Sequence, residues 1–165
     1  MIMNLVDQHD PTLRRPAAVV DSVADVQDLI KDLYDTLEVS HGVGLAAPQI
    51  GVSKQVFVIA IDGIKKTFIN PVVLSTSDHP VEDIEGCLSL PGLRLKVKRP
   101  PQIKAMWTNE QGEQEIADLD GLWARCWLHE YDHVNGILID DRVSRLVLSL
   151  AKKKLAKQQK IKKRT

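Results

Sequence analysis

The feature that most limits how this chain can fold is a central run of strand-like segments that no predicted helix interrupts. Residues 55–61 (QVFVIAI) are short and rich in β-branched side chains, as in a buried strand. Residues 93–99 (LRLKVKR) alternate apolar with basic side chains, which is typical of a strand with one solvent-facing side. Residues 102–108 and 113–119 flank the turn sequence NEQG and predict a hairpin. Strands that do not alternate with helices favour an α+β fold with mainly antiparallel sheets.

Helices are predicted only on either side of that run. Apolar residues recur at helical spacing over residues 23–38, which indicates an N-terminal helix. A second helix is predicted at 121–135, where a glycine follows it. A third is predicted from about Val143 towards the C-terminus, and Asp140 or Asp141 would supply its cap.

Composition narrows the class of protein. A chain of 165 residues is about one domain long, and it contains no internal repeat or low-complexity linker, so we expect a single domain over residues 1–165. No apolar run approaches the roughly 18 residues needed to span a bilayer, and we expect neither a signal peptide nor a membrane partner. With only two cysteines, Cys87 and Cys126, a secreted disulfide scaffold is disfavoured. These observations favour a reducing, cytoplasmic setting.

The net charge of zero conceals an uneven distribution. Residues 142–165 contain ten of the 22 basic side chains and no acid, so residues 1–141 hold the other 12 basic groups against all 22 acids. A basic helix at one end of an acidic body can contact a polyanion only at that end, or can simply increase solubility. We expect no DNA partner.

The sequence HEYDH at residues 129–133 predicts a metal site. On a helix, His129 and His133 lie on the same face, so both imidazoles can reach one ion. Glu130 lies beside them and is placed to act as a general base towards an activated water. The alternative is a solvated helix that carries two unrelated histidines.

A catalytic metal site needs a third protein ligand. No His, Glu or Cys follows His133, so a zinc endopeptidase with a downstream ligand is disfavoured. The upstream candidates are His9, His41, His79, Cys87 and Cys126. Cys126 precedes His133 by seven residues, about 10.5 Å along a helix, which the two side chains would barely span around one ion, so a small buried residue is the favoured interpretation of Cys126. Cys87, in the sequence EGCLSLPG, is the favoured ligand, and a buried structural thiol is its alternative interpretation.

Three separated segments resemble the peptide deformylase family: GVGLAAPQIG at 42–51, EGCLSLPG at 85–92 and HEYDHVNGIL at 129–138. The similarity extends from DPTLRRPA at 10–17 to the basic C-terminal helix, 142–165. The resemblance implies antiparallel sheets packed around a central metal-binding helix, with an N-terminal helix beside them. It also implies that the chain removes the formyl group from the N-terminal formylmethionine of new polypeptides, by attack of a metal-activated water.

The resemblance also implies the roles of individual residues. The ligands of one divalent ion per chain would be Cys87, His129 and His133. The catalytic groups would be Glu130 as general acid and base, with Gln49 and the backbone N–H of Leu88 as oxyanion donors. The substrate-binding residues would be Gly42, Val43, Gly44, Gly86, Leu122, Arg125 and Cys126. The expected ion is Fe²⁺, with Zn²⁺ or Ni²⁺ able to occupy the site.

Two residues just before the HEYDH motif leave the shape and polarity of the substrate pocket undecided at the level of sequence. Leu128 stands where the family usually has glutamine, and Arg125 either lies in solvent or narrows the pocket. A non-catalytic or altered-substrate metal protein of this family is the alternative function. The expected partners are N-formylmethionyl peptides and, through the basic C-terminal helix, the ribosome.

Overall fold

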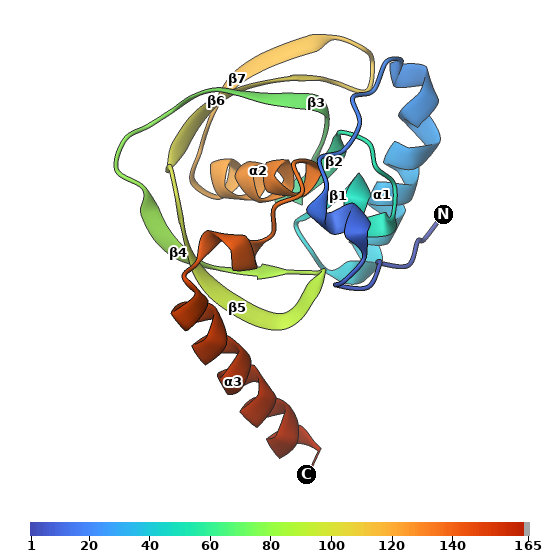
Figure 1. Ribbon diagram of the computed structural model, residues 1–165. Helices are drawn as coiled ribbons and strands as arrows, with labels where there is room; N and C mark the ends of the chain where they lie inside the picture. The colour runs from blue at the N-terminus through green and yellow to red at the C-terminus, as the bar shows by residue number, and fades with distance from the viewer. Residues whose placement is uncertain (164–165) are drawn as a thin grey trace.

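Helix α2 (Gly121–Val134) runs through the middle of the molecule, and strands surround it (Figure 1). The computed structural model describes residues 1–163. Its strands are β1 (Gly44–Ala46), β2 (Val56–Ile61), β3 (Ile64–Thr76), β4 (Val81–Cys87), β5 (Leu90–Arg99), β6 (Gln102–Thr108) and β7 (Gln114–Asp120). The other α-helices are α1 (Gln27–Ser40) and α3 (Arg145–Lys162), and four short 3-10 helices are η1 (Pro11–Arg14), η2 (Val23–Val26), η3 (Ala47–Ile50) and η4 (Ile139–Arg142).

The strands form two antiparallel sheets. The larger sheet has the order β1-β2-β3-β6-β7, and the smaller one is the hairpin β4-β5. Every pairing between the named strands is antiparallel. The α+β fold with antiparallel sheets around a central helix is therefore confirmed.

The core lies between α2 and the five-stranded sheet. Aromatic side chains fill it, with Phe57 stacked on Phe68 and the Trp127 ring edge-on to both. Trp127 lies on the face of α2 that packs against the sheet, and its side chain is fully buried. The opposite side of α2 is thereby left to face the β4-β5 hairpin.

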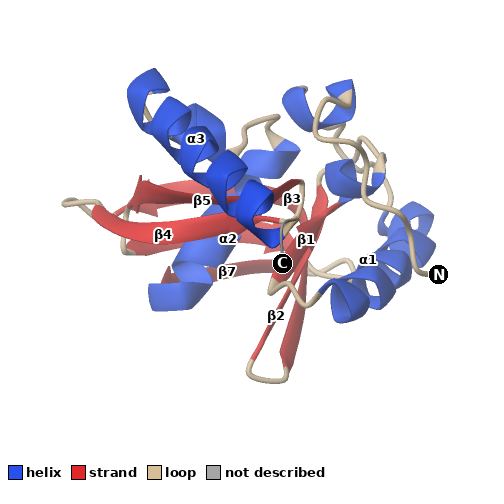
Figure 2. Cartoon of the chain, turned by 90° about the horizontal axis from the view of Figure 1, so that it is seen from below, coloured by secondary structure: helices blue, strands red, loops and turns tan. Residues whose placement is uncertain are grey.

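The hairpin has its own apolar cluster. Leu90, Leu93, Leu95 and Val97 are buried at alternating positions of β5, as the sequence pattern predicts. The far side of this cluster is closed by α3, whose Leu155 and its apolar neighbours pack against β5 (Figure 2).

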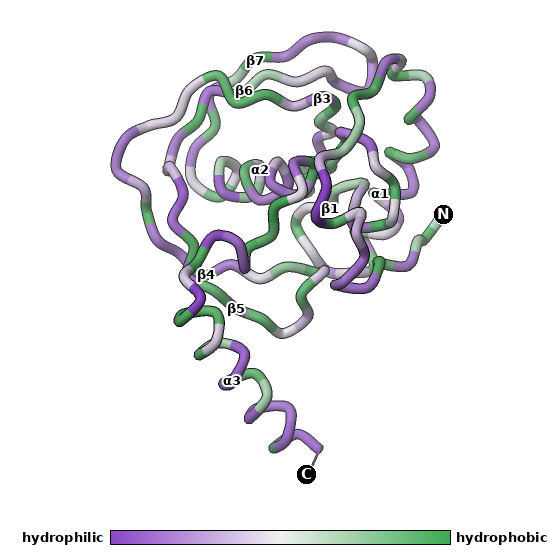
Figure 3. The backbone as a smooth tube through the Cα atoms, viewed as in Figure 1, coloured by the Kyte–Doolittle hydropathy of each residue, from purple (hydrophilic) through white to green (hydrophobic). Residues whose placement is uncertain are grey.

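The basic segment differs from the prediction in two respects. Its helix begins at Arg145, and Ser144 caps it by accepting a hydrogen bond from the Val147 N–H, so the predicted aspartate cap is wrong. Asp140 and Asp141 instead pair with the guanidinium of Arg14 in η1. Along α3 hydrophilic positions dominate, interrupted by apolar ones (Figure 3). Among residues 1–163, no helix is both long and apolar enough to cross a bilayer.

Other boundaries also shift. The first predicted helix opens as η2, and its α-helical part starts at Gln27. The segment 42–51, for which no helix or strand was predicted, contains strand β1 and the buried helix η3. Strands β3 and β4 had no corresponding prediction, because their exposed positions obscure the alternation of apolar and polar side chains.

Candidate metal centre and active site

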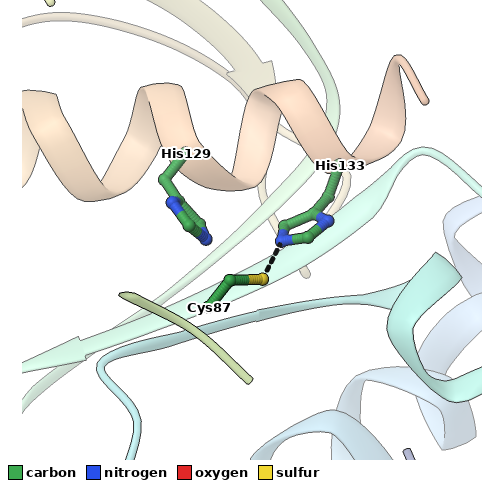
Figure 4. Close-up of side chains that lie close together, drawn as sticks. All are labelled: Cys87, His129 and His133. Atoms are coloured by element: carbon green, nitrogen blue, oxygen red, sulfur yellow. Dashed lines mark hydrogen bonds between the residues drawn. The ribbon is translucent and has the colours of Figure 1, made fainter. Parts of the chain in front are cut away.

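Two elements bring the three predicted ligands together. His129 and His133 project from one face of α2, and Cys87 stands at the end of β4 (Figure 4). Their ligand atoms all lie within 4.8 Å of one another, and the Cys87 Sγ is 3.3 Å from the His133 Nε2. Zinc–sulfur and zinc–nitrogen bonds of about 2.3 and 2.0–2.1 Å together exceed that separation, so one ion can reach both atoms. A thiolate with two imidazoles also suits a divalent transition metal.

Glu85 fixes the orientation of His129. Its Oε1 lies 2.9 Å from the His129 Nδ1, and the adjacent Arg99 donates to both carboxylate oxygens. Burial raises the pKa of Glu85, but hydrogen bonds from His129 and Arg99 outweigh it and lower that pKa to about 2. An ionised carboxylate can only accept, so the His129 Nδ1 carries a proton. When the imidazole is neutral, its Nε2 lone pair is therefore the one directed to the cluster.

The two histidines have opposite electrostatic surroundings. Burial lowers the pKa of His129, but contacts with Cys87 and Glu85 raise it to about 10. Complete burial, together with the nearby positive charges of His129 and Arg99, holds the pKa of His133 well below its usual value. The His133 Nδ1 has no hydrogen-bond partner within residues 1–163. A neutral imidazole is the form that binds a metal ion.

Glu130 is enclosed beside the cluster. Burial raises its pKa to about 7, although the positive charges of His129 and Arg99 oppose the shift. Its Oε2 has no hydrogen-bond partner in the described part of the chain. A Cβ atom on Gly44 would lie 2.5 Å from the Glu130 Oε1, so the glycine leaves the space that the carboxylate occupies.

The side-chain amide of Gln49 also lies next to the ligand cluster. Its Oε1 accepts the Ala46 N–H at 3.0 Å, which fixes which end of the amide is oxygen. The Nε2 then lies 3.1 Å from the Ser89 Oγ and 3.9 Å from the Cys87 Sγ. A buried amide donor is thereby held next to the candidate ligands. Leu88 is half-buried in the turn between β4 and β5.

A cavity of about 490 Å³ opens beside the cluster. It is lined by all seven residues predicted to bind substrate: Gly42, Val43, Gly44, Gly86, Leu122, Arg125 and Cys126. Gln49, Leu88, Cys87, His129 and Glu130 also line it. Sequence reasoning missed further wall residues, namely His41, Ile84, Glu85, Pro91, Gly92, Leu93 and Arg94. Most of these have no chemical signature, and His41 was considered only as a candidate metal ligand.

Cys126 lies in the cavity wall and apart from the ligand cluster. Burial raises the pKa of its thiol to about 12, with the negative charge of Glu130 as the next contribution. A protonated thiol of that kind behaves as a small apolar side chain. The helix-rise argument against Cys126 as a ligand agrees with this placement.

The sequence interpretation also missed an ionic network behind the ligands. Arg99 joins Glu85 to Asp132, and Arg142 donates to Asp132 from the other side. The two acids, Glu85 and Asp132, stand within the sequences EGCLSLPG and HEYDH that carry the candidate ligands. Their burial, which demands a cationic partner, was the signal that could have identified them.

Metal-dependent hydrolases are the class that this fold and site define, because a buried carboxylate stands beside three convergent metal-ligand atoms at the wall of a cavity. The profile of the polypeptide deformylase family matches residues 2–148. The chain belongs to this family. Its reaction is therefore the metal-dependent removal of the formyl group from the N-terminal formylmethionine of new polypeptides.

Named relatives agree with that assignment. The peptide deformylase of Acidothermus cellulolyticus is 47% identical over 81% of this chain and 74% of its own length. That of Clostridium botulinum is 41% identical over 87% of this chain and 98% of its own. The solved peptide deformylase of Legionella pneumophila superposes with a TM-score of 0.89 at 36% identity, covering 100% of this chain and 99% of the other. The Synechococcus elongatus enzyme, in complex with actinonin, gives 0.88 at 38% identity, covering 93% and 86%.

Proposed function

We propose that Cys87, His129 and His133 hold one divalent ion and that Glu130 is the general acid and base of deformylation. The observation that carries this proposal is the convergence of the three ligand atoms within 4.8 Å, with the buried Glu130 carboxylate beside them. When bound, such an ion lowers the pKa of a coordinated water from 15.7 towards about 7.

The Glu130 carboxylate takes a proton from the attacking water while a carbon–oxygen bond forms at the formyl carbonyl. The same carboxyl group then delivers that proton to the departing α-amine as the carbon–nitrogen bond breaks. Water is consumed, and formate and a free N-terminal amine leave. A base whose pKa is near 7 can perform both transfers at neutral pH, and burial raises the pKa of Glu130 to that value.

Gln49 and Leu88 stabilise the negative charge that develops on the carbonyl oxygen. The Gln49 Nε2 donates from one side and the backbone N–H of Leu88 from the other. Because the Ala46 N–H holds the Gln49 amide in place, this donor needs no reorientation during the reaction. Removal of one such donor typically costs about 10²–10³ in rate.

The substrate binds as an extended chain in the cavity. Its backbone pairs beside Gly44 and Gly86, in the manner of an added strand. Its methionine side chain contacts Val43, Leu122 and Cys126, which line the cavity together. Val43 and Leu122 are exposed apolar side chains, which a bound peptide would cover.

Fe²⁺ is the ion we propose for the site, with Zn²⁺ or Ni²⁺ as substitutes. A site of one cysteine and two histidines suits all three ions, and such a site binds Zn²⁺ more tightly than Fe²⁺. Iron loading therefore depends on which metal the cell supplies. A ferrous ion bound by a thiolate is also open to oxidation.

We also propose a cytoplasmic setting and a ribosome contact through α3. The helix presents Lys152, Lys153 and Lys157 on its exposed surface. The substrate of the enzyme is a newly made polypeptide, which leaves the ribosome. Contacts of lysine with RNA phosphate are electrostatic and weaken steeply with salt.

The activity is tested with formyl-Met-Ala-Ser and its acetylated twin. We expect formate release from the first peptide and no cleavage of the second. Cleavage of internal peptide bonds would indicate an endopeptidase, and no reaction with either peptide in the metal-loaded chain would indicate a non-catalytic member of the family.

A further inference from the structure

Arg125 lies one helical turn before His129 on α2, and its side chain is only 15% exposed. The guanidinium makes three hydrogen bonds, all to the β4-β5 hairpin. Its Nη1 donates to the Glu85 Oε2 at 2.7 Å and to the Val97 carbonyl at 3.0 Å, and its Nη2 donates to the Val81 carbonyl at 2.8 Å. It therefore binds both strands of the hairpin at once.

The apolar packing of the hairpin does not involve α2. The buried leucines of β5 cluster with Leu13, Leu138 and α3, whereas the buried residues of α2 cluster with the five-stranded sheet. Polar contacts consequently set the position of the hairpin relative to α2. Among those described above, they are the three bonds of Arg125, the His129–Glu85 bond, the Arg99–Asp132 pair and the contact between the Cys87 Sγ and the His133 Nε2.

This interface matters because the ligands lie on both sides of it. Cys87 belongs to the hairpin, and His129 and His133 belong to α2. A shift of the hairpin along or away from α2 would change the distance from the Cys87 Sγ to both imidazoles. Arg125 and His129 also hold the two oxygens of one carboxylate, because Arg125 binds Oε2 and His129 binds Oε1 of Glu85.

Arg99 does not replace Arg125 in this respect. It lies on β5, within the same hairpin as Glu85, so its bonds to that carboxylate orient the side chain without joining the hairpin to α2. Its link to α2 is a single bond to Asp132, which Arg142 shares.

We propose that Arg125 is a positioning residue of the metal site, which docks the hairpin that carries Cys87 onto the helix that carries the two histidines. The proposal rests on the ligand set proposed above. It assigns Arg125 to the architecture of the site, where the sequence suggested only solvent exposure or substrate contact.

The first test measures metal affinity of the full chain by competition between a chromophoric chelator and the metal-free protein for Zn²⁺. Arg125→Met keeps the length of the side chain and removes its donors, and we expect a 10- to 100-fold loss of affinity, as for other groups that orient metal ligands. Arg125→Lys retains a charge but not the three-point contact, and should lose less. Arg14→Met, which removes a two-aspartate contact between η1 and η4, is the control and should leave affinity within about twofold.

The second measurement separates positioning from substrate binding. At saturating metal, Arg125→Met should lower kcat and leave KM for formyl-Met-Ala-Ser within about twofold. In the Co²⁺-substituted protein, its thiolate-to-cobalt absorption band should shift. A raised KM with wild-type metal affinity would overturn the proposal and make Arg125 a substrate-binding residue. If Arg125→Met does not fold, the affinity of Arg125→Lys decides, and a value within twofold of wild type overturns the proposal.

A double-variant cycle tests whether Arg125 acts through Glu85. Arg125→Met, Glu85→Gln and the double variant are compared for Zn²⁺ affinity, and we expect the double variant to lose less than the product of the two single losses. Multiplicative losses would overturn the proposal. Cys87→Ala is measured in parallel: if it binds metal like wild type, the proposed ligand set fails, whereas wild-type affinity in Arg125→Met alone refutes only the role of Arg125.

Discussion

At the scale of single residues, the space between Gly44 and Glu130 is the tightest constraint in the site. An added Cβ would lie 2.5 Å from the Glu130 Oε1 and 2.9 Å from its Cγ and Cδ. Because the Glu130 carboxylate is buried, any displacement of it would change its position relative to the Cys87, His129 and His133 cluster.

Gly44→Ala should therefore displace Glu130 and lower kcat by about 10²-fold or more, within the range that a general acid or base contributes. The three proposed metal ligands are untouched, so we expect a full equivalent of metal. Formate release and metal analysis on the same preparation check this. A near-normal rate would mean that the carboxylate is not required where it stands.

Glu130→Gln keeps the shape of the side chain and removes its proton transfer. We expect normal metal binding and a loss of several orders of magnitude in kcat. In the wild type, kcat should rise with pH through about 7, because only the ionised Glu130 accepts a proton. A flat pH profile over that range would contradict the assignment.

The same variant has a stability consequence in the metal-free protein. Folding raises the pKa of Glu130 from 4.5 to about 7, so the folded state holds a proton that the unfolded state releases between those values. Its contribution is fully present below pH 4.5 and is lost as pH rises through about 7. Relative to wild type, Glu130→Gln should gain up to about 3 kcal/mol between pH 5 and 8 in urea unfolding.

The two cysteines should behave differently. Cys87→Ala should abolish stoichiometric metal binding and activity, because the Cys87 Sγ lies within the ligand cluster. Cys126→Ala should retain both, since burial makes its thiol a small apolar group. Metal analysis of the purified variants distinguishes them, and a metal-free Cys126 variant would reverse the ligand assignment.

The residues of the candidate site could be selected from the sequence where their chemistry leaves a pattern in it. His129 and His133 are visible from helical spacing alone, whereas Cys87 needed a process of elimination and the family resemblance. Glu85 was not found, because one acid in an exposed-looking strand becomes informative only once its burial is known. Arg125 was assigned to solvent or to the pocket, and its contacts with the hairpin were not foreseen, because its partners, the Glu85 carboxylate and two backbone carbonyls, lie on other elements.

At the scale of elements, α3 depends on its first turn. Ser144 accepts the Val147 N–H at 3.2 Å, and α3 is docked on the body only by partly buried side chains such as Leu148 and Leu155. Ser144→Ala should cost about 1 kcal/mol of helix stability. Ser149→Ala, on the exposed surface of the same helix, is the matched control. Amide hydrogen exchange of α3 should quicken only in the first variant, and equal exchange in both would exclude the cap.

A helix or strand could be predicted from the sequence when its buried residues recur at a regular spacing. The alternation in β5 and the helical spacing of α1 and α2 each reflect one buried face. Strand β4 has four exposed residues in a row, so nothing in its composition distinguishes it from a loop. The aspartates before α3 were misassigned because Arg14, far away in sequence, competes for them.

At the scale of the whole molecule, we expect the basic side chains of α3 to contribute nothing to catalysis. Lys152, Lys153 and Lys157 are exposed and line no part of the substrate cavity. Replacing all three with glutamine should leave formate release unchanged and reduce co-sedimentation with ribosomes at low salt. Equal co-sedimentation of both proteins across a salt series would leave α3 with only a solubilising role.

The division of the proposed ligands between the β4-β5 hairpin and α2 would have a consequence for the lifetime of the protein. An ion held by both elements closes a loop of chain between Cys87 and His129, so its binding free energy adds to folding stability. Without the ion, the hairpin has only its apolar cluster and polar contacts to prevent local opening. Opening exposes backbone to proteases, and degradation follows the population of the open form. Metal supply would then determine how many copies survive in the cell as well as how many are active.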